Sequence, residues 1–270
     1  KDNKDYVFEE ASSLRDVIVR MIQKGVLVDA NIRAALIAGI DRESYAKNLL
    51  QDTFIAGKAP LPPSLGYGFK QVKAPNQYSP ENARKLLAQS GWVDTDGDGY
   101  VDKDGQDLVL DFYTYTSRPE LNLYAEAMQA DYKKIGIGIN IKIVDYSVID
   151  ELAKSGAYDL MISSVVTANT GNPVWFLKQY WSSNIDGANP NNGSGYSNPR
   201  YDELLALAGS TMDSTTAHNA IISAQQILLD DNAAIYLGYP KINLVGKNYM
   251  KGIHVSPCEY YIITKDLKKE

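Results

Sequence analysis

The hydrophobic positions of this chain follow two periods in turn, so strands and helices are expected to alternate. The regular part is residues 108–166, where apolar residues recur first at every second position and then at every third or fourth. This part predicts a strand at 108–115, a helix at 120–135 ended by Gly136, a strand at 137–144, a helix at 148–154 and a strand at 158–166. Such an order predicts an α/β fold.

The same reading extends to both sides of this part. Before it, we expect a strand at 15–22, a helix capped by Asp29, a second helical stretch at 42–50 and a helix that begins at Ser79-Pro80 and ends at Gly91. After it, we expect helices at 202–208 and 215–229 and strands at 233–237 and 242–247. No internal repeat is present.

Two segments show neither period. Residues 54–77 are rich in proline and glycine, which predicts an extended loop. Residues 169–198 are rich in Asn and Gly and contain Trp175, Tyr180, Trp181 and Tyr196. Aromatic side chains in such an uncharged loop either form a platform for a ligand or anchor the loop, and the pattern leaves both interpretations open.

Composition narrows the classes of function. The 270 residues are 44% hydrophobic and 22% charged, which is typical of a soluble globular protein with one large core or two modest ones. The net charge of −6 and the scattered Lys and Arg residues argue against nucleic acid as the main partner. Cys258 is the single cysteine, which rules out an internal disulfide.

An aspartate-rich stretch, GWVDTDGDGYVDKDGQ at 91–106, resembles a calcium loop at its start but not at its end. The loop would be closed by a bidentate Glu, and Gly105 stands there instead. The alternative is a solvated turn held by Asx hydrogen bonds. The ligands of a weak calcium site would be Asp94, Asp96, Asp98, the carbonyl group of Tyr100, and Asp102.

The chain lacks the usual signs of catalysis. His218 and His254 are the only histidines, and neither has a metal-ligating neighbour at helical or hairpin spacing. No motif for a nucleophilic serine, a zinc protease or a phosphate-binding loop occurs. We therefore expect no enzyme. A hydrolase that uses carboxylates of the aspartate-rich loop is the alternative, and a detached sensory domain is a third.

Several short motifs occur in a fixed order along the chain. They are NIRAALIAGIDRE at 31–43, SPENARKLLAQSGW at 79–92, MQADYKKIGI at 128–137 and GYSNPRYD at 195–202. In this order they resemble the family 5 extracellular solute-binding proteins, which are the peptide- and nickel-binding receptors of bacterial ABC importers. The resemblance implies an α/β fold: a periplasmic-binding-protein-like lobe of type II, with a mixed sheet flanked by helices, plus hinge strands.

Members of this family close two lobes on a ligand, and the chain resembles their C-terminal half. Residues 1–23 would then be a hinge strand and a remnant of the first lobe, residues 24–237 the second lobe, and residues 238–270 a tail that returns to the first lobe. Because the chain begins with Lys1, we expect a mature chain or a fragment. Apolar surface made for the missing N-terminal lobe predicts modest solubility or self-association.

The resemblance also bears on the aspartate-rich stretch and on the ligand. Similar proteins have a hairpin at this stretch, so it is expected to be a turn, with Ca²⁺ as an untested addition. Dipeptide-binding relatives place an Asp where this chain has Asn169, and a neutral amide lacks the charge that pairs with a peptide ammonium group. Nickel-binding relatives use a Trp and a His, and the positions near Val166 and Ser183 carry neither.

Two other stretches, SRPELNLYAEAMQ and LGYPKINLV, resemble the nickel-type receptors more than the oligopeptide-binding ones. We expect a solute-binding component of an ABC importer that captures nickel as a chelate or metallophore, or short peptides, and delivers them to the membrane permease. The alternative within the family is an oligopeptide-specific receptor. We expect no required cofactor. The expected location of the protein is the extracellular face of the membrane, as a lipoprotein, or the periplasm. The predicted ligand-binding residues are Arg118, Asn169, Thr170, Trp175, Tyr180 and Trp181.

Overall fold

The computed structural model describes residues 4–259 and 263–269. Its strands are β1 (Tyr6–Ser12), β2 (Arg15–Met21), β3 (Phe54–Ala56), β4 (Asp102–Lys103), β5 (Gln106–Asp107), β6 (Val109–Tyr115), β7 (Gly138–Val144), β8 (Leu160–Val166), β9 (Ala234–Lys247), β10 (Met250–Lys251) and β11 (Lys268–Lys269). Its α-helices are α1 (Ala30–Ala38), α2 (Arg42–Ser44), α3 (Pro80–Gln89), α4 (Pro119–Lys133), α5 (Tyr146–Ser155), α6 (Val174–Trp181), α7 (Pro199–Ser210) and α8 (Ser214–Asp230). Two short 3₁₀ helices, η1 (Gly25–Val28) and η3 (Pro63–Leu65), and a π-helical turn, η2 (Tyr45–Leu49), complete the described elements.

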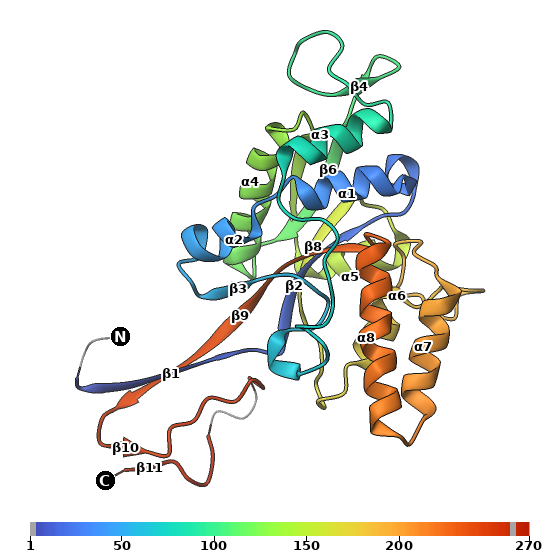
Figure 1. Ribbon diagram of the computed structural model, residues 1–270. Helices are drawn as coiled ribbons and strands as arrows, with labels where there is room; N and C mark the ends of the chain where they lie inside the picture. The colour runs from blue at the N-terminus through green and yellow to red at the C-terminus, as the bar shows by residue number, and fades with distance from the viewer. Residues whose placement is uncertain (1–3, 260–262, 270) are drawn as a thin grey trace.

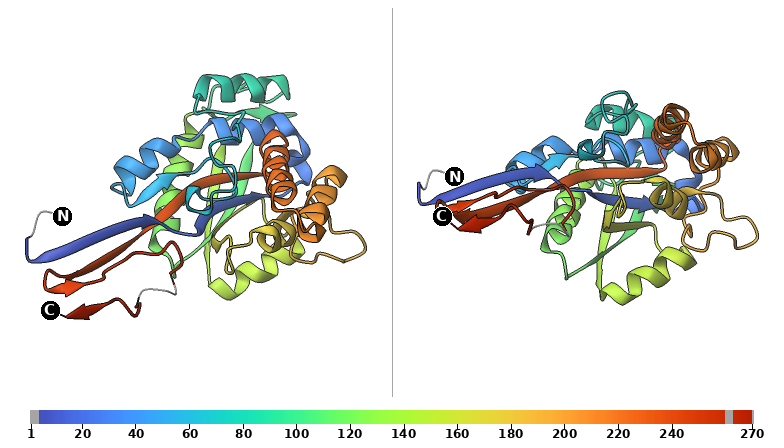
Figure 2. Two further views of the ribbon diagram at one scale, coloured as in Figure 1. Left: turned by 60° about the horizontal axis from the view of Figure 1, so that its bottom comes forward. Right: turned by 90° about the horizontal axis from the view of Figure 1, so that it is seen from below.

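A mixed sheet of seven strands forms the centre of the protein (Figure 1). Its order is β1-β9-β2-β8-β6-β7, and β3 pairs with β9 beside this path. Strand β6 runs parallel to β7 and β8, whereas β2 is antiparallel to β8 and to β9. Helices lie on both sides of the sheet (Figure 2). This architecture confirms the α/β fold with a mixed sheet that the sequence predicts.

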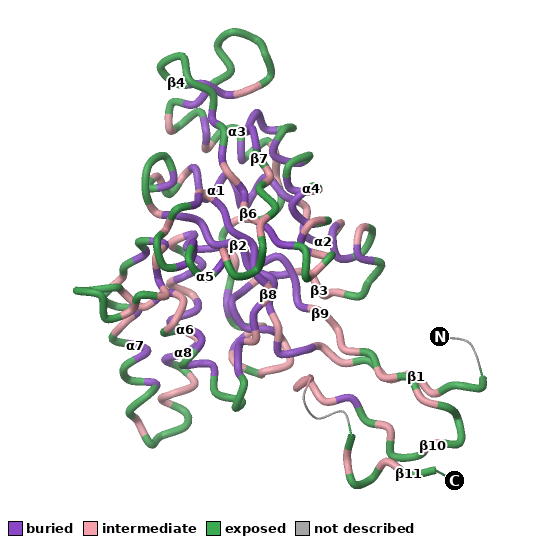
Figure 3. Tube along the Cα trace, turned by 180° about the vertical axis from the view of Figure 1, so that it is seen from behind, coloured by how far each residue is buried: buried purple, intermediate pink, exposed green. Residues whose placement is uncertain are grey.

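Two hydrophobic clusters pack against the sheet, and β2 contributes to both. Val17, Val19 and Met21 belong to the cluster that includes α1, α3, α4 and α5. Ile18, which points to the other face, belongs to the cluster that includes α6, α7 and α8. Since alternate residues of a strand face opposite sides, β2 is buried on both faces, and the purple centre of Figure 3 follows it.

Strands β1 and β9 leave the body together as a two-stranded ribbon (Figure 1). The first half of β9 pairs with β2 inside the body, and its second half pairs with β1 along the ribbon. In Figure 3 the outer part of this ribbon is largely exposed. The sequence predicts two strands at 233–237 and 242–247, but the structure has one, because the intervening residues Gly238–Lys241 continue the ladder with β3 and β1.

Several local predictions need correction. No element is predicted before residue 15, but β1 forms there, because β9 provides a pairing partner that the local pattern does not reveal. The loop predicted at 54–77 contains β3 and η3. The helical stretch predicted at 42–50 is confirmed over 42–49, with the α-helical turn α2 followed by the π-helical η2. The irregular segment 169–198 contains α6.

Candidate ligand-binding edge of the sheet

The carboxyl ends of the parallel strands β6, β7 and β8 meet at one edge of the sheet. Tyr115 at the end of β6 pairs with Val144 at the end of β7, and Val166 ends β8 opposite Arg15 of β2. Ligands of open α/β sheets collect beyond such ends. The residues that follow these ends, including Arg118 and Asn169, form the candidate site, which we call the ligand-binding edge.

Arg118 occupies the residue before the first turn of α4. Pro119 begins that helix, and the Arg118 side chain makes no capping hydrogen bond. Its guanidinium lies 3.9 Å from the Glu120 carboxylate, and the side chain is 38% exposed. An ion pair this long and exposed stabilises little, so the guanidinium remains able to bind the carboxylate of a ligand.

Asn169 and Thr170 lie in the exposed turn between β8 and α6. The start of this turn is fixed by Thr167, whose amide and hydroxyl both donate to the Leu14 carbonyl oxygen, at 2.9 and 2.8 Å. Asn169 also lines a small cavity formed with the C-terminal tail, which includes Cys258 and Glu259. The turn is therefore anchored at its base to Leu14, the residue before β2, while its tip faces solvent.

The C-terminal tail covers part of the ligand-binding edge. The Leu14 amide donates to the Pro257 carbonyl oxygen at 3.1 Å, and Arg15 forms an ion pair with Glu259. These contacts place 257–259 beside Asn169. A ligand at the edge would have to share this space with the tail or displace it.

The aromatic residues of α6 separate into three environments. Trp175 is 60% exposed, whereas Trp181 is 1% exposed and packs edge-on against Tyr236 of β9. Tyr180 is partly buried beneath the Arg20 guanidinium, 4.8 Å from the ring centroid, and burial raises the pKa of its hydroxyl. Trp181 is thus a core anchor, and Trp175 is the ring that reaches solvent.

Tyr146 is an edge residue that sequence reasoning missed. It lies two residues after the end of β7, at the first position of α5, and it is 54% exposed. Its ring packs edge-on against Tyr115, with 5.1 Å between the ring centroids, and the Tyr115 hydroxyl accepts a hydrogen bond from the Ser164 amide. Its position two residues after the predicted strand 137–144 was the signal that could have found it.

The aspartate-rich stretch forms an exposed hairpin far from the ligand-binding edge (Figure 1). The Asp94 carboxylate accepts hydrogen bonds from the amides of Gly97 and Gly99, at 2.7 and 3.1 Å, which is the Asx pattern. Carboxylate oxygens of Asp94, Asp96 and Asp102 lie within 4.8 Å of one another, and Asp98 is not part of this group.

These hydrogen bonds account for the shape of the hairpin. Asp98 accepts from the Tyr100 amide at 2.8 Å, and the Asp102 carboxylate accepts from the amide and hydroxyl of Thr95. Ca²⁺ takes six to eight oxygen ligands, so three carboxylates already engaged by the protein fit it only in part. The contacts favour the turn interpretation, and calcium binding stays a prediction.

Within the described residues, no helix is long and apolar enough to cross a membrane. Those residues also hold no cluster of histidine or cysteine ligands for a metal ion, and Cys258 is a free thiol.

Comparison with known proteins identifies the chain's relatives. Residues 1–188 match the family model described as bacterial extracellular solute-binding proteins, family 5 Middle. The oligopeptide-binding protein AppA of Bacillus subtilis is 27% identical over 231 residues, which are 85% of this chain and 42% of AppA. The nickel-binding protein NikA of Staphylococcus aureus is 27% identical over 263 residues, which are 97% of this chain and 50% of NikA. The chain thus spans about half the length of these relatives.

Solved structures show the same fold. The structure of AppA with a nonapeptide superposes with a TM-score of 0.81 at 24% identity and covers 95% of this chain and 51% of that chain. NikA from Brucella suis with Fe(III)-EDTA reaches a TM-score of 0.86 at 18% identity and covers 98% and 53% of the two chains. The family match extends over more than half of the sequence, and the mixed sheet agrees with it. The chain therefore belongs to the family 5 bacterial extracellular solute-binding proteins.

Proposed function

We propose that this chain is one ligand-binding lobe of a receptor that captures a small solute for a bacterial ABC importer. The observation that carries the proposal is the ligand-binding edge, where the ends of three parallel strands bring Arg118, Asn169 and Thr170 to one side of a family 5 fold. Trp175 and Tyr180 are the aromatic residues we add to this site. Trp181 supports it from the core.

The ribbon supports a proposal for the lobe boundaries. We propose that β2 and the ribbon strands form the hinge, that residues 24–237 form the lobe, and that the tail from 238 reaches toward a second lobe N-terminal to it. In support, β9 leaves the body at Gly238, which pairs with both Val17 of β2 and Ala56 of β3, and from Lys241 onward β9 pairs with β1 along the ribbon. Closure of two lobes about such strands is a hinge motion around the ligand.

The relatives point to two classes of solute, a nickel chelate and a short peptide. We infer the nickel chelate from the charges at the edge. Asn169 is neutral, and Glu259 is paired with Arg15, so neither offers a free carboxylate to a peptide ammonium group. Arg118, in contrast, can hold a carboxylate of a chelator by two parallel hydrogen bonds.

The proposed receptor binds its solute without chemical change. Desolvation and a few placed hydrogen bonds hold the solute, and a membrane permease recognises the closed form. The site of action is outside the cytoplasmic membrane, as a lipoprotein or in the periplasm. A hydrolase that uses the aspartate-rich stretch receives no support, because the hairpin is exposed and its carboxylates hold its own backbone.

Native mass spectrometry tests the proposal. The chain, reconstituted with an N-terminal lobe, is incubated with a peptide mixture and, separately, with Ni²⁺ plus histidine. We expect a retained nickel-histidine mass, and we expect Arg118→Gln to weaken retention about tenfold or more, since a charge-assisted bidentate contact is lost. Arg200→Gln, which removes an exposed arginine paired with Glu203 on α7, is the matched control.

The outcomes separate the proposals. A retained peptide would overturn the nickel inference and keep the receptor. Retention of neither solute would argue against both classes, and equal weakening by the two arginine variants would remove Arg118 from the site.

A further inference from the structure

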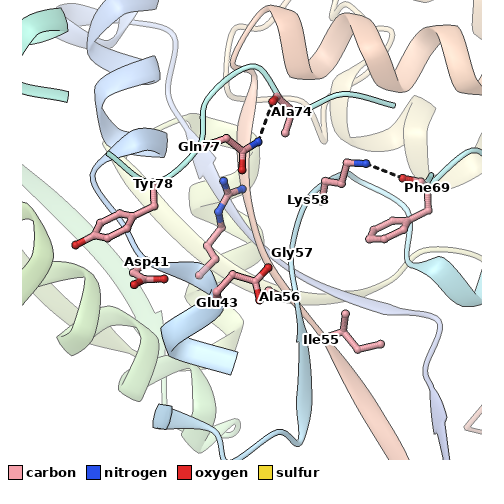
Figure 4. Close-up of a pocket in the computed structure, with 11 residues that line it drawn as sticks. Asp41, Glu43, Ile55, Ala56, Gly57, Lys58, Phe69, Ala74, Gln77 and Tyr78 are labelled. Atoms are coloured by element: carbon pink, nitrogen blue, oxygen red, sulfur yellow. Dashed lines mark hydrogen bonds between the residues drawn. The ribbon is translucent and has the colours of Figure 1, made fainter. Parts of the chain in front are cut away.

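A second cavity, of about 390 Å³, lies beside β3 and shares no lining residue with the ligand-binding edge (Figure 4). We call it the β3 cavity. Three segments line it: the start of α2, the stretch from β3 to Lys58, and the loop that leads to α3. Its size is in the range of cavities that bind small molecules. The lining residues used below are Asp41, Arg42, Glu43, Lys58, Phe69 and Tyr78.

Arg42 is a buried cation of this cavity, and its side-chain charge has no ion-pair partner among the described residues. The residue is 9% exposed, and the hydrogen bond that places it is a single donation to the Asn76 carbonyl oxygen at 3.2 Å. Burial lowers the pKa of its guanidinium, as expected for a charge removed from water. Buried charges are normally paired, so Arg42 has capacity for an anion.

Lys58 is the second cation that faces the β3 cavity. Its ammonium group donates to the Phe69 carbonyl oxygen at 3.0 Å and lies 5.4 Å from the centroid of the Phe69 ring. Both contacts are with neutral groups. Arg42 and Lys58 also line a smaller cavity that reaches Asn232 and Tyr236, so the two cations stand between the cavities.

The other side of the β3 cavity is acidic. Figure 4 shows Asp41 and Tyr78 on one side and Lys58 and Phe69 on the other. Asp41 accepts a hydrogen bond from the Ser44 amide at 2.9 Å, and Glu43 is exposed. Neither carboxylate lies within ion-pair distance of Arg42 or Lys58 in the described structure, although the Glu43 charge acts on Arg42 at longer range and opposes the lowering of its pKa. A dianion such as phosphate would be repelled by Asp41 and Glu43, whereas a singly charged carboxylate would be repelled less.

We propose that the β3 cavity binds a small organic carboxylate of amino-acid size, with its carboxylate facing Arg42 and Lys58. A planar carboxylate matches the fork of a guanidinium, which donates two parallel hydrogen bonds. In a zwitterionic amino acid the ammonium group faces Asp41 and Glu43, and an apolar side chain packs on Phe69. The inference does not depend on the solute proposed for the ligand-binding edge.

Isothermal titration calorimetry on the 270-residue chain tests this site with four probes. Leucine carries both charges, N-acetylleucine keeps only the carboxylate, leucinamide keeps only the ammonium group, and inorganic phosphate is the competing anion. We expect leucine and N-acetylleucine to bind at millimolar concentration, leucine more tightly. Leucinamide and phosphate should not bind.

Variants assign the binding to the cavity. We expect Arg42→Gln and Lys58→Gln each to weaken leucine binding about tenfold or more, because each removes a charge-assisted contact. Lys70→Gln makes the same charge change on an exposed neighbour outside the cavity and should leave binding unchanged. Arg118→Gln should also leave it unchanged, which separates this cavity from the ligand-binding edge.

Arg42 also holds the Asn76 carbonyl group, so its variant can lose stability. If the Tm of Arg42→Gln falls, the comparison of Lys58→Gln with Lys70→Gln decides the result. No binding of either carboxylate, binding that survives Lys58→Gln, or phosphate binding as tight as that of leucine would each overturn the proposal.

Discussion

At the scale of single residues, Asp16 is a carboxyl group buried in the core of the described structure. It lies on β2, it is 0% exposed, and neither carboxylate oxygen has a hydrogen-bond partner of normal geometry among the described residues. Burial raises the pKa of the carboxyl well above its usual range, and the adjacent Val17 amide offsets this only in part. The folded chain therefore holds a proton on Asp16 where the unfolded chain has lost it.

Because of this proton, the free energy of unfolding depends on pH. Below the unfolded pKa, about 3.8, the carboxyl is neutral in both states, so burial costs no charge there. As pH rises toward the raised folded pKa, the unfolded state gains by releasing its proton, and the free energy of unfolding falls. Above the folded pKa the whole cost is present.

We expect Asp16→Asn to remove this dependence. Near neutral pH, the free energy of unfolding of the variant should be about 1–3 kcal/mol higher than that of the parent. Below about pH 3.8 the two proteins should differ little. Urea unfolding across this pH range is the measurement, with the exposed Asp186→Asn as control. A variant that is less stable at every pH would show that the carboxylate has a partner after all.

At the scale of elements, the period of the hydrophobic residues predicted those strands and helices whose pattern is complete within their own residues. The strands β6, β7 and β8 and the helices between them carry their periods within themselves, so 108–166 could be read without the fold. Strand β1 could not be read in this way, because its pairing partner is residues 241–247, far along the chain. Helix α6 was missed although its buried residues Val174, Leu177 and Trp181 recur at helical spacing, because the segment around it is rich in Asn and Gly.

The same limit applies to the candidate site. Arg118 and Asn169 follow the predicted strands 108–115 and 158–166, so the order of elements was enough to locate them beyond the strand ends, and their part in ligand binding stays a prediction. Whether an aromatic ring of 169–198 faces solvent or the core depends on how α6 meets the sheet, so Trp175 and Trp181 could not be told apart. The edge position of Tyr146 depends on the register of β6 with β7.

Two glycines test the packing of single elements. Gly238 lies where β9 shifts its register against β2, and a Cβ there would come within 2.6 Å of the Tyr124 hydroxyl and 3.1 Å of the Ile55 carbonyl oxygen. We expect Gly238→Ala to destabilise the chain by about 1–3 kcal/mol. Gly209 lies within α7, where a Cβ would meet at its closest the flexible Lys178 ammonium at 3.4 Å.

We therefore expect Gly209→Ala to stabilise the chain by about 0.5–1 kcal/mol, because alanine is the better helix former. Chemical denaturation of both variants against the parent measures the two effects. A Gly238→Ala variant as stable as the parent would contradict the close approach at Gly238, and a destabilised Gly209→Ala variant would contradict the ordinary contact distances at Gly209.

At the scale of the whole molecule, the ribbon extends away from the body and packs little against it. Val245 of β9 is 56% exposed, and β1 is the outermost strand on its side of the sheet. An edge strand with apolar neighbours can pair with another chain. We expect the isolated chain to associate as its concentration rises.

Sedimentation velocity at several concentrations measures this association. Val245→Glu should shift the chain toward the monomer, since a charge on the ribbon opposes contact between copies. Ile185→Glu makes the same change at another exposed position, 66% exposed and away from the ribbon, and should leave the association unchanged. A monomer at every concentration would show that the ribbon does not drive contact.

The continuity of β9 also has a mechanical consequence. One backbone of fourteen residues runs through the body and out along the ribbon, so the two parts have no separate joint. Movement of the ribbon relative to the body must then twist or bend a hydrogen-bonded ladder. Because this strains the hydrogen bonds, the ladder opposes the movement with a restoring force. The register shift opposite Val17 and Ile18 interrupts that ladder, so the flexing should concentrate there, next to the buried carboxyl of Asp16.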